Sequence, residues 1–182
     1  MDKRNTYAKD FNEEYIYNSY FKKYEDISFY ANIHLNNNFR RIAQSIVKSN
    51  RIFFNFKEKE MNLNSMPVKV NSKLADSHYI HFYKTRMFNQ NIIKSFHYFN
   101  DELFLINLLI KDLNDYECIS LINILRGIIL RSTDSKNNHL FRDNQENILL
   151  IETKNELSLS CMKSNLSLFT KNFFLLKTAM VV

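Results

Sequence analysis

Three histidines lie close enough along the chain to suggest a metal site. His78 and His81 are three residues apart, and His97 lies one further segment along. Structural zinc sites usually take four ligands at defined spacings. No third ligand stands at helical spacing from the first two, and the stretch around Pro67 does not assure a helix at His78. We predict no metal site and expect these histidines to be exposed or half-buried.

Other reactive side chains do not form a catalytic arrangement in the sequence. Cys118 has apolar neighbours that would not activate its thiol, so we expect a buried structural cysteine. Glu13 and Glu14 are adjacent and would point in different directions on a helix, whereas Asp112 and Asp115 suit solvated or capping positions. The chain also lacks a nucleophile elbow, a Walker loop and a His-Glu-x-x-His motif. We predict no cofactor and no enzymatic activity.

Basic and aromatic residues alternate around residues 21–24 and 39–41. Proteins that bind single-stranded nucleic acid combine these residue types, and a formal charge of +6 permits such binding. Elsewhere Lys and Arg are scattered among acids, and no nucleic-acid motif is present. A small basic nucleic-acid-binding protein is therefore the second hypothesis, and nucleic acid is the less favoured partner.

The composition predicts one packed domain over residues 1–182. Hydrophobic residues make up 45% of the chain, with 16 Phe and 10 Tyr, which provides ample apolar area for a core. A single Gly and a single Pro argue against glycine-rich phosphate loops and folds with many tight turns. Two cysteines cannot form a disulfide framework, and no apolar run is long enough to span a bilayer. We expect a soluble intracellular protein without a membrane span.

Apolar residues recur three and four positions apart over much of the chain, which predicts helices. Residues 61–75 contain Pro67 and are expected to form a flexible loop with a short alternating segment, and the tail after about residue 167 is expected to be loose. No internal repeat is evident. The expected helices cover residues 10–24, 39–54, 92–109, 116–130, 140–156 and 161–176.

The 116–130 segment is the expected centre of this bundle. Asn114 stands three residues before Glu117, as in a capping box, and the residues that follow are apolar on almost every side. Such a helix must be covered all round by others. The positions predicted to be buried in the core are Phe39, Ala43, Ile46, Val47, Ile119, Ile122, Ile128 and Ile129.

Tyr17, Phe21 and Tyr24 form a second ring-bearing face on the first expected helix. Tyr and Phe are common in protein interfaces, so these rings suit contact with a partner or with a second copy of the chain. The alternative is that they cover the chain's own core.

Three stretches resemble the Bcl-2-like immunomodulators of poxviruses. These are Glu14-Tyr-Ile-Tyr17, the segment Leu35–Ala43, in which Phe39 precedes Ala43 by four, and Tyr116-Glu-Cys-Ile-Ser-Leu-Ile122. The chain departs from the family pattern because it has no Trp, and the small-residue patch of the central helix is replaced, with Gly127 displaced.

This resemblance implies an all-α fold of six to eight helices around the buried 116–130 helix. It implies an antagonist of host innate immune signalling that blocks NF-kappa-B activation or interferon induction by binding host signalling proteins in the host cell cytoplasm. Several members of the family pair through helix one, which would allow a homodimer. A third hypothesis is an anti-apoptotic protein that binds pro-apoptotic helices. The signalling branch is favoured over it because the tail is short and is broken by Lys177.

Overall fold

The structure is a computed structural model. It describes residues 21–26, 28–30, 33, 39–43, 45–49, 54, 67–72, 74–87, 90–110, 113, 116–117, 119–121, 139–153 and 156–163.

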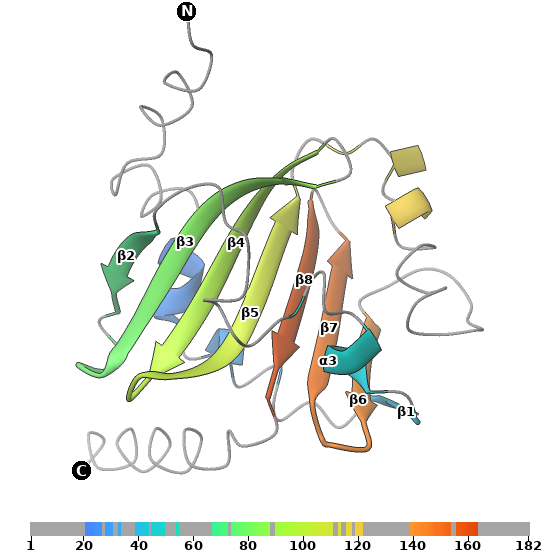
Figure 1. The fold of residues 1–182 in the computed structure, drawn as a ribbon, viewed down its shortest axis with the longest axis horizontal. Coiled ribbons are helices and arrows are strands. Elements are labelled where there is room, and N and C mark those ends of the chain that lie inside the picture. Colours follow the sequence, from blue (N-terminus) through green and yellow to red (C-terminus); the bar gives the residue numbers. More distant parts are fainter. Residues whose placement is uncertain are drawn as a thin grey trace, which may run out of the picture.

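These residues build a single eight-stranded sheet with the order β1-β6-β7-β8-β5-β4-β3-β2 (Figure 1). Neighbouring strands are antiparallel except β1 and β6, which are parallel. The strands are β1 (Arg40–Ile42), β2 (Val68–Asn71), β3 (His78–Met87), β4 (Gln90–Phe99), β5 (Glu102–Ile110), β6 (His139–Asp143), β7 (Ile148–Thr153) and β8 (Leu157–Met162).

The topology contains a repeat that the sequence does not show. Strands β3, β4 and β5 form one antiparallel meander, and β6, β7 and β8 form a second. The last strands of the two meanders, β5 and β8, pair antiparallel at the centre of the sheet, with Asn107 opposite Ser160. The pairing of β5 with β8 therefore joins the two meanders in the middle of the sheet.

Each face of the sheet carries its own hydrophobic core. One core contains Phe21, Tyr24, Tyr30 and Ile33, and we call this side the N-terminal face. It includes the short 3-10 helix η2 (Lys22–Glu25). The other side, the α3 face, is covered by Ile46 of α3 (Ile46–Ser49) and by further segments that include Phe54 and Leu121. Figure 1 is viewed from the α3 side, with α3 in front of the sheet.

The predicted all-α bundle is wrong, and with it the Bcl-2-like fold. Residues 92–109, expected to be helical, form most of β4 and β5. Residues 140–156 lie mainly in β6 and β7. The expected 39–54 helix is replaced by β1 and the four-residue α3.

The error has a physical cause in the burial of β4 and β5. Residues 92–98 and 103–110 are all buried, because both faces of the sheet are covered. A strand buried on both faces loses the alternation of apolar and polar residues, so its apolar positions can match helical spacing by chance. Asn100 and Asp101, which fall inside the expected 92–109 helix, have φ of 49° and 61° and form a two-residue hairpin turn. Two positive φ values suit this turn, and Asn and Asp tolerate them.

The expectations for the 61–75 loop, the 116–130 segment and the tail can be compared with the structure only in part. Val68–Asn71, inside the expected 61–75 loop, is strand β2, in agreement with the alternating pattern noted there. Described residues at the start of the 116–130 segment are helical, but most of that segment lies outside the described residues. The 61–66 stretch and the tail after residue 167 also lie outside them. Within the described part of the chain, no helix is long and apolar enough to cross a membrane.

The predicted core residues are placed unevenly. Ile46 is 1% exposed, and Val47 and Phe39 are partly buried against the two cores. Ala43 is exposed, and Ile119 is 58% exposed, so the prediction that these two are buried is wrong. The reason is that Ala43 follows an edge strand and Ile119 lies in a helical segment beside the sheet. Ile122, Ile128 and Ile129 lie outside the described residues.

Candidate functional site

A chain of polar side chains is buried on the N-terminal face. The Tyr30 hydroxyl lies 3.0 Å from Nδ1 of His97 and 3.4 Å from Nε2 of His78. On the other side of the His97 ring, Nε2 lies 3.0 Å from the Ser95 hydroxyl. The contacts are satisfied together if His78 donates to Tyr30, Tyr30 donates to His97, and His97 donates to Ser95.

A second polar group lies beside it in the centre of the sheet. The Tyr24 hydroxyl donates to Oδ1 of Asn107 at 2.8 Å. The Asn107 amide nitrogen donates to the hydroxyls of Ser158 and Ser160 at 2.9 and 2.8 Å. The Tyr24 ring also packs edge-on against His97, with centroids 4.5 Å apart. Two tyrosines therefore attach the N-terminal segment to strands β3, β4, β5 and β8.

Burial favours the uncharged forms of His78, His97 and Tyr30. It lowers the pKa of His78 to about 4 and, with smaller contributions from His78 and Lys23, lowers the pKa of His97. Burial also raises the pKa of Tyr30. Ser95 and His97 have the residue types of a nucleophile and its base, but they are 2% and 0% exposed. A substrate cannot reach either side chain in this arrangement. We therefore interpret these hydrogen-bonded side chains as the contacts that attach the N-terminal segment to the sheet.

We expect acid to weaken the fold through these histidines. The folded pKa of His78, about 4, lies below the ordinary 6.5, so between these values the unfolded chain binds a proton that the folded chain excludes. The free energy of unfolding should therefore fall as the pH drops from 6.5 towards 4, by up to about 1.4 kcal/mol per pH unit for this residue. Denaturant unfolding at a series of pH values measures this slope.

The matched variant is His78→Phe, which keeps an aromatic ring of similar size without the titrating group. Its slope over the same pH range should be smaller than that of the parent protein. Equal slopes for the two proteins would show that His78 does not contribute to the acid sensitivity.

A buried lysine lies on the opposite face. Lys94 of β4 is 1% exposed, and its side chain points to the α3 face beside Tyr83 of β3. Its Nζ lies 5.5 Å from the centre of the Phe96 ring. Burial lowers the pKa of Lys94 to about 7, so the amine is only partly charged at neutral pH. Sequence reasoning missed Lys94 because a single Lys in an apolar run suggests the solvated side of a helix.

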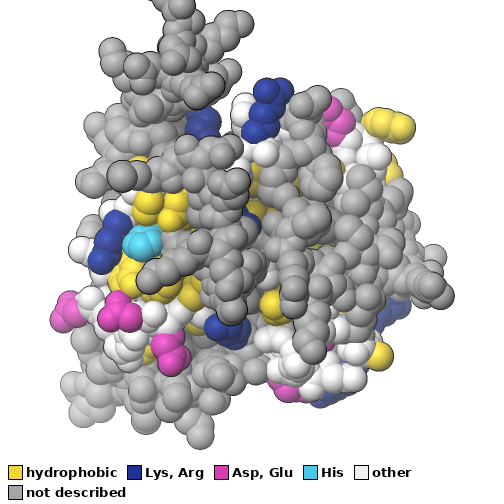
Figure 2. Space-filling model, in the orientation of Figure 1, with side chains coloured by type: hydrophobic (Ala, Val, Ile, Leu, Met, Phe, Trp, Pro, Cys, Tyr) yellow, Lys and Arg dark blue, Asp and Glu magenta, His cyan; other side chains and the backbone are white. Residues whose placement is uncertain are grey.

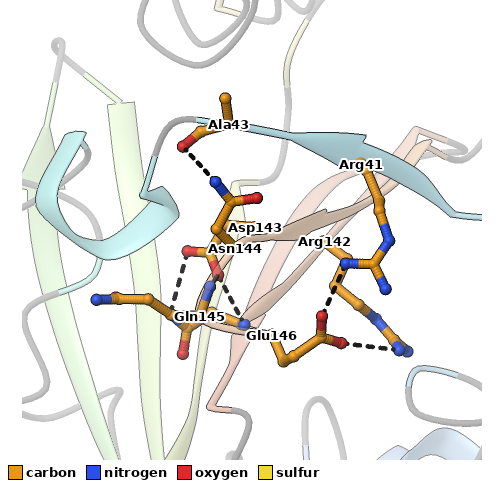
Figure 3. Close-up of polar contacts among 8 residues, drawn as sticks. Arg41, Ala43, Arg142, Asp143, Asn144, Gln145 and Glu146 are labelled. Carbon is orange, nitrogen blue, oxygen red and sulfur yellow. Dashed lines mark hydrogen bonds and ion pairs between the residues drawn. The ribbon is translucent and has the colours of Figure 1, made fainter.

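A buried carboxylate organises the β6–β7 turn (Figure 3). Asp143 is 0% exposed and accepts hydrogen bonds from the backbone nitrogens of Ile46, Gln145 and Asn147, each at 2.9 Å. It also accepts one from the Asn147 side chain at 3.1 Å. The Ile46 bond fastens the first residue of α3 to the turn. Glu146, with φ of 61°, completes the reversal of the chain.

The basic and aromatic residues at 39–41 lie next to this turn. Arg41 and Arg142 both pair with Glu146, at 2.8 and 3.2 Å (Figure 3). The Phe39 ring lies 4.1 Å from the Arg142 guanidinium and 5.4 Å from that of Arg41. The hydrogen bond from Arg41 is the main cause that lowers the pKa of Glu146. These cations already contact a carboxylate and a ring, which does not favour the stacking of a nucleobase on Phe39.

The arrangement best suited to a partner lies on the α3 face, where β2, β3 and β4 meet. We call Lys69, Tyr79, His81 and Tyr98 the aromatic patch. Tyr79 and Tyr98 are a cross-strand pair with stacked rings, 4.9 Å apart at 11°. The His81 ring lies 5.2 Å from Tyr79 and 5.1 Å from Tyr98, and the Lys69 Nζ lies 4.1 Å from the Tyr79 ring centre. Tyr79 also donates to Asp101 at 3.0 Å.

The aromatic patch reaches the surface. Lys69 is exposed, Tyr79 and His81 are partly exposed, and Tyr98 lies beneath them at 9%. Figure 2 shows a histidine among hydrophobic side chains on this face, with Lys or Arg beside it and acidic groups below. The patch is therefore a partly exposed set of rings with a charged border, which is the usual anatomy of a protein-binding surface.

The ring-bearing face that was predicted to contact a partner is buried where the structure describes it. Phe21 and Tyr24 are each 1% exposed and pack in the core of the N-terminal face, which agrees with the alternative that these rings cover the chain's own core. Tyr17 lies outside the described residues.

The three histidines are not arranged as their spacing suggests. His78 and His97 lie on one face with rings 6.2 Å apart, and His81 lies on the other. The expectation that all three are exposed or half-buried is wrong for the first two, which are 0% exposed. An interpretation of 78–81 as a strand would have separated His78 from His81. Among the described residues, no group of three or more metal-ligating side chains occurs.

No protein-family model, no curated protein and no solved structure matches this chain.

Proposed function

We propose that this protein acts by binding another protein through the aromatic patch, and not by catalysis. The stacked Tyr79 and Tyr98 rings with His81 beside them are the observation that supports this function. Tyr is enriched among the residues that contribute most to binding energy, because it combines a large apolar area with a polar tip. The patch lies on a rigid paired sheet, so little side-chain freedom would be lost on binding.

The carboxylates near the patch favour a protein over a nucleic acid. Asp101 accepts a hydrogen bond from Tyr79, and Asp76 is exposed in the adjacent β2–β3 turn. Phosphate groups would be repelled by them, although the whole chain carries a formal charge of +6. Nucleic-acid binding is retained only as an outcome of the experiment below.

Affinity capture from mammalian cell extracts tests the proposal. The tagged parent protein is compared with Tyr79→Ala, and with Tyr116→Ala as the matched control, since Tyr116 is 80% exposed and belongs to a helical segment outside the patch. We expect proteins that resist high salt to be captured by the parent and the control, and to be lost with Tyr79→Ala. Circular dichroism checks that all three proteins are folded.

Two outcomes would contradict the proposal. The same captured proteins with Tyr79→Ala as with the parent would place binding elsewhere on the molecule. Recovery of nucleic acid that is lost at high salt would favour the second hypothesis, since phosphate contacts weaken steeply with salt.

A more specific proposal is that the captured partner is a host signalling protein of the NF-kappa-B or interferon pathway. It depends on the three short stretches that resemble the poxvirus family, whereas the described residues form an eight-stranded sheet and not the helical fold that this resemblance implies. Reporter assays in transfected cells, with the parent and Tyr79→Ala, test it. Location in the host cytoplasm and homodimer formation stay predictions.

A further inference from the structure

Carboxylates lie in the two turns next to the aromatic patch, although the whole chain carries a formal charge of +6. The β2–β3 turn contains Asp76, and the β4–β5 turn contains Asp101 followed by Glu102. The two turns lie side by side, since the Asn100 nitrogen donates to the Ser77 carbonyl at 3.1 Å. Asp101 therefore borders the patch, where it accepts the hydrogen bond from Tyr79. Asp76 lies in the adjacent turn, whereas Glu102 pairs with Phe99 and belongs to the N-terminal face.

The described cation closest to Asp101 and the Tyr79 ring is Lys69, which lies in the patch itself. The arginines at the neighbouring β6–β7 turn, Arg41 and Arg142, are paired with Glu146. A basic side chain of a partner would therefore complement Asp101.

The Tyr79 ring already holds a cation. The ammonium group of Lys69 lies 4.1 Å from its centre, within the range of a cation–π contact. Lys69 is exposed on the short edge strand β2. Its side chain can therefore move aside at little cost in buried area. The Asp101 carboxylate accepts a hydrogen bond from Tyr79, so a carboxylate lies at the rim of the ring.

An arginine suits this combination of groups. A guanidinium stacks on an aromatic ring through its flat face and pairs with a carboxylate through its edge. Tyr79 and Asp101 present a ring and a carboxylate side by side. A lysine can use either group but cannot match both geometries at once.

We propose that the aromatic patch binds an arginine-bearing segment of the partner protein, whose guanidinium displaces Lys69 from the Tyr79 ring and pairs with Asp101. This inference rests on the proposed function and names the chemistry of the partner. It makes Lys69 a competitor for the site, so loss of Lys69 should strengthen binding, whereas loss of the Asp101 charge should weaken it.

Binding of a fluorescent arginine–serine peptide to the full chain tests the proposal. We expect Asp101→Asn to weaken binding by about threefold and Lys69→Ala to strengthen it by a similar factor, as an exposed cation–π contact or ion pair allows. A lysine–serine peptide should bind more weakly than the arginine peptide. Lys22→Ala is the matched control, because it removes one positive charge from an exposed position in η2, on the other face of the sheet.

The outcomes separate this inference from the proposed function. Equal strengthening by Lys69→Ala and Lys22→Ala would show a general effect of net charge and would overturn the site. No peptide binding, together with loss of captured proteins for Tyr79→Ala, would leave the proposed function in place and remove the arginine chemistry. Peptide binding unchanged in both Asp101→Asn and Lys69→Ala would also overturn it, because the peptide would then bind elsewhere.

Discussion

Replacement of Lys94 by Met is expected to raise the free energy of unfolding at neutral pH by about 4 kcal/mol. The Lys94 side chain is 1% exposed, and burial holds its folded pKa at about 7 against an ordinary value of 10.5. At neutral pH the unfolded chain keeps the proton that the folded chain partly releases, so folding is penalised. Met has a similar size and no charge, which removes the penalty.

The sign of the pH dependence follows from the same values. Between about pH 7 and 10.5 the unfolded chain binds more protons at this site than the folded chain, so the parent protein should become more stable as the pH rises. Below this window both states are protonated, and the penalty is constant. Lys94→Met should lack this rise.

Chemical denaturation at several alkaline and neutral pH values measures both effects. Lys22→Met is the control, because Lys22 is exposed and its replacement should change stability by less than about 0.5 kcal/mol. A Lys94→Met protein that is no more stable than the parent at neutral pH would contradict the prediction.

Replacement of Asp143 by Ala is expected to lower the free energy of unfolding by about 4 kcal/mol. Three backbone N–H groups and one side-chain amide would lose their acceptor, and the group around Asp143 and Asn147 is buried. The start of α3 would also be released from the β6–β7 turn. Thermal and denaturant unfolding measure the loss.

The neighbouring Asn144 provides the control. It is exposed, and its side chain makes a 3.4 Å contact with the Ala43 carbonyl, so Asn144→Ala should cost less than about 0.5 kcal/mol. Asp143→Asn keeps one acceptor oxygen and should fall between the two. Similar losses for Asp143→Ala and Asn144→Ala would show that the buried carboxylate is not the centre of the turn.

The helical prediction failed at particular residues. Ile92, Phe96 and Phe99 have helical spacing, but they belong to a strand in which every residue from 92 to 98 is buried. The polar residues Lys94, Ser95 and His97 break what would otherwise be a continuous apolar run, the usual mark of a strand inside a sheet. The informative signal was Asn100-Asp101, a pair suited to a hairpin turn.

The candidate site was even less accessible to sequence reasoning. Lys69, Tyr79 and Tyr98 come from three strands, and only the registers of β2 with β3 and of β3 with β4 bring them together. A shift of one residue in either register would turn the side chain from the shifted strand to the opposite face and separate it from the others.

The sequence by itself determined that the chain has enough apolar and aromatic residues for a packed core, and that certain positions turn or extend, such as Asn100-Asp101 and the alternating Val68–Asn71. Those properties depend on residue type and on immediate neighbours. Only the tertiary structure decided that His78 and His97 share a face, that Asn107 meets Ser160, and that Lys94 is buried. These contacts join residues far apart in the chain, and they are set by strand order, register and the burial of both faces of the sheet.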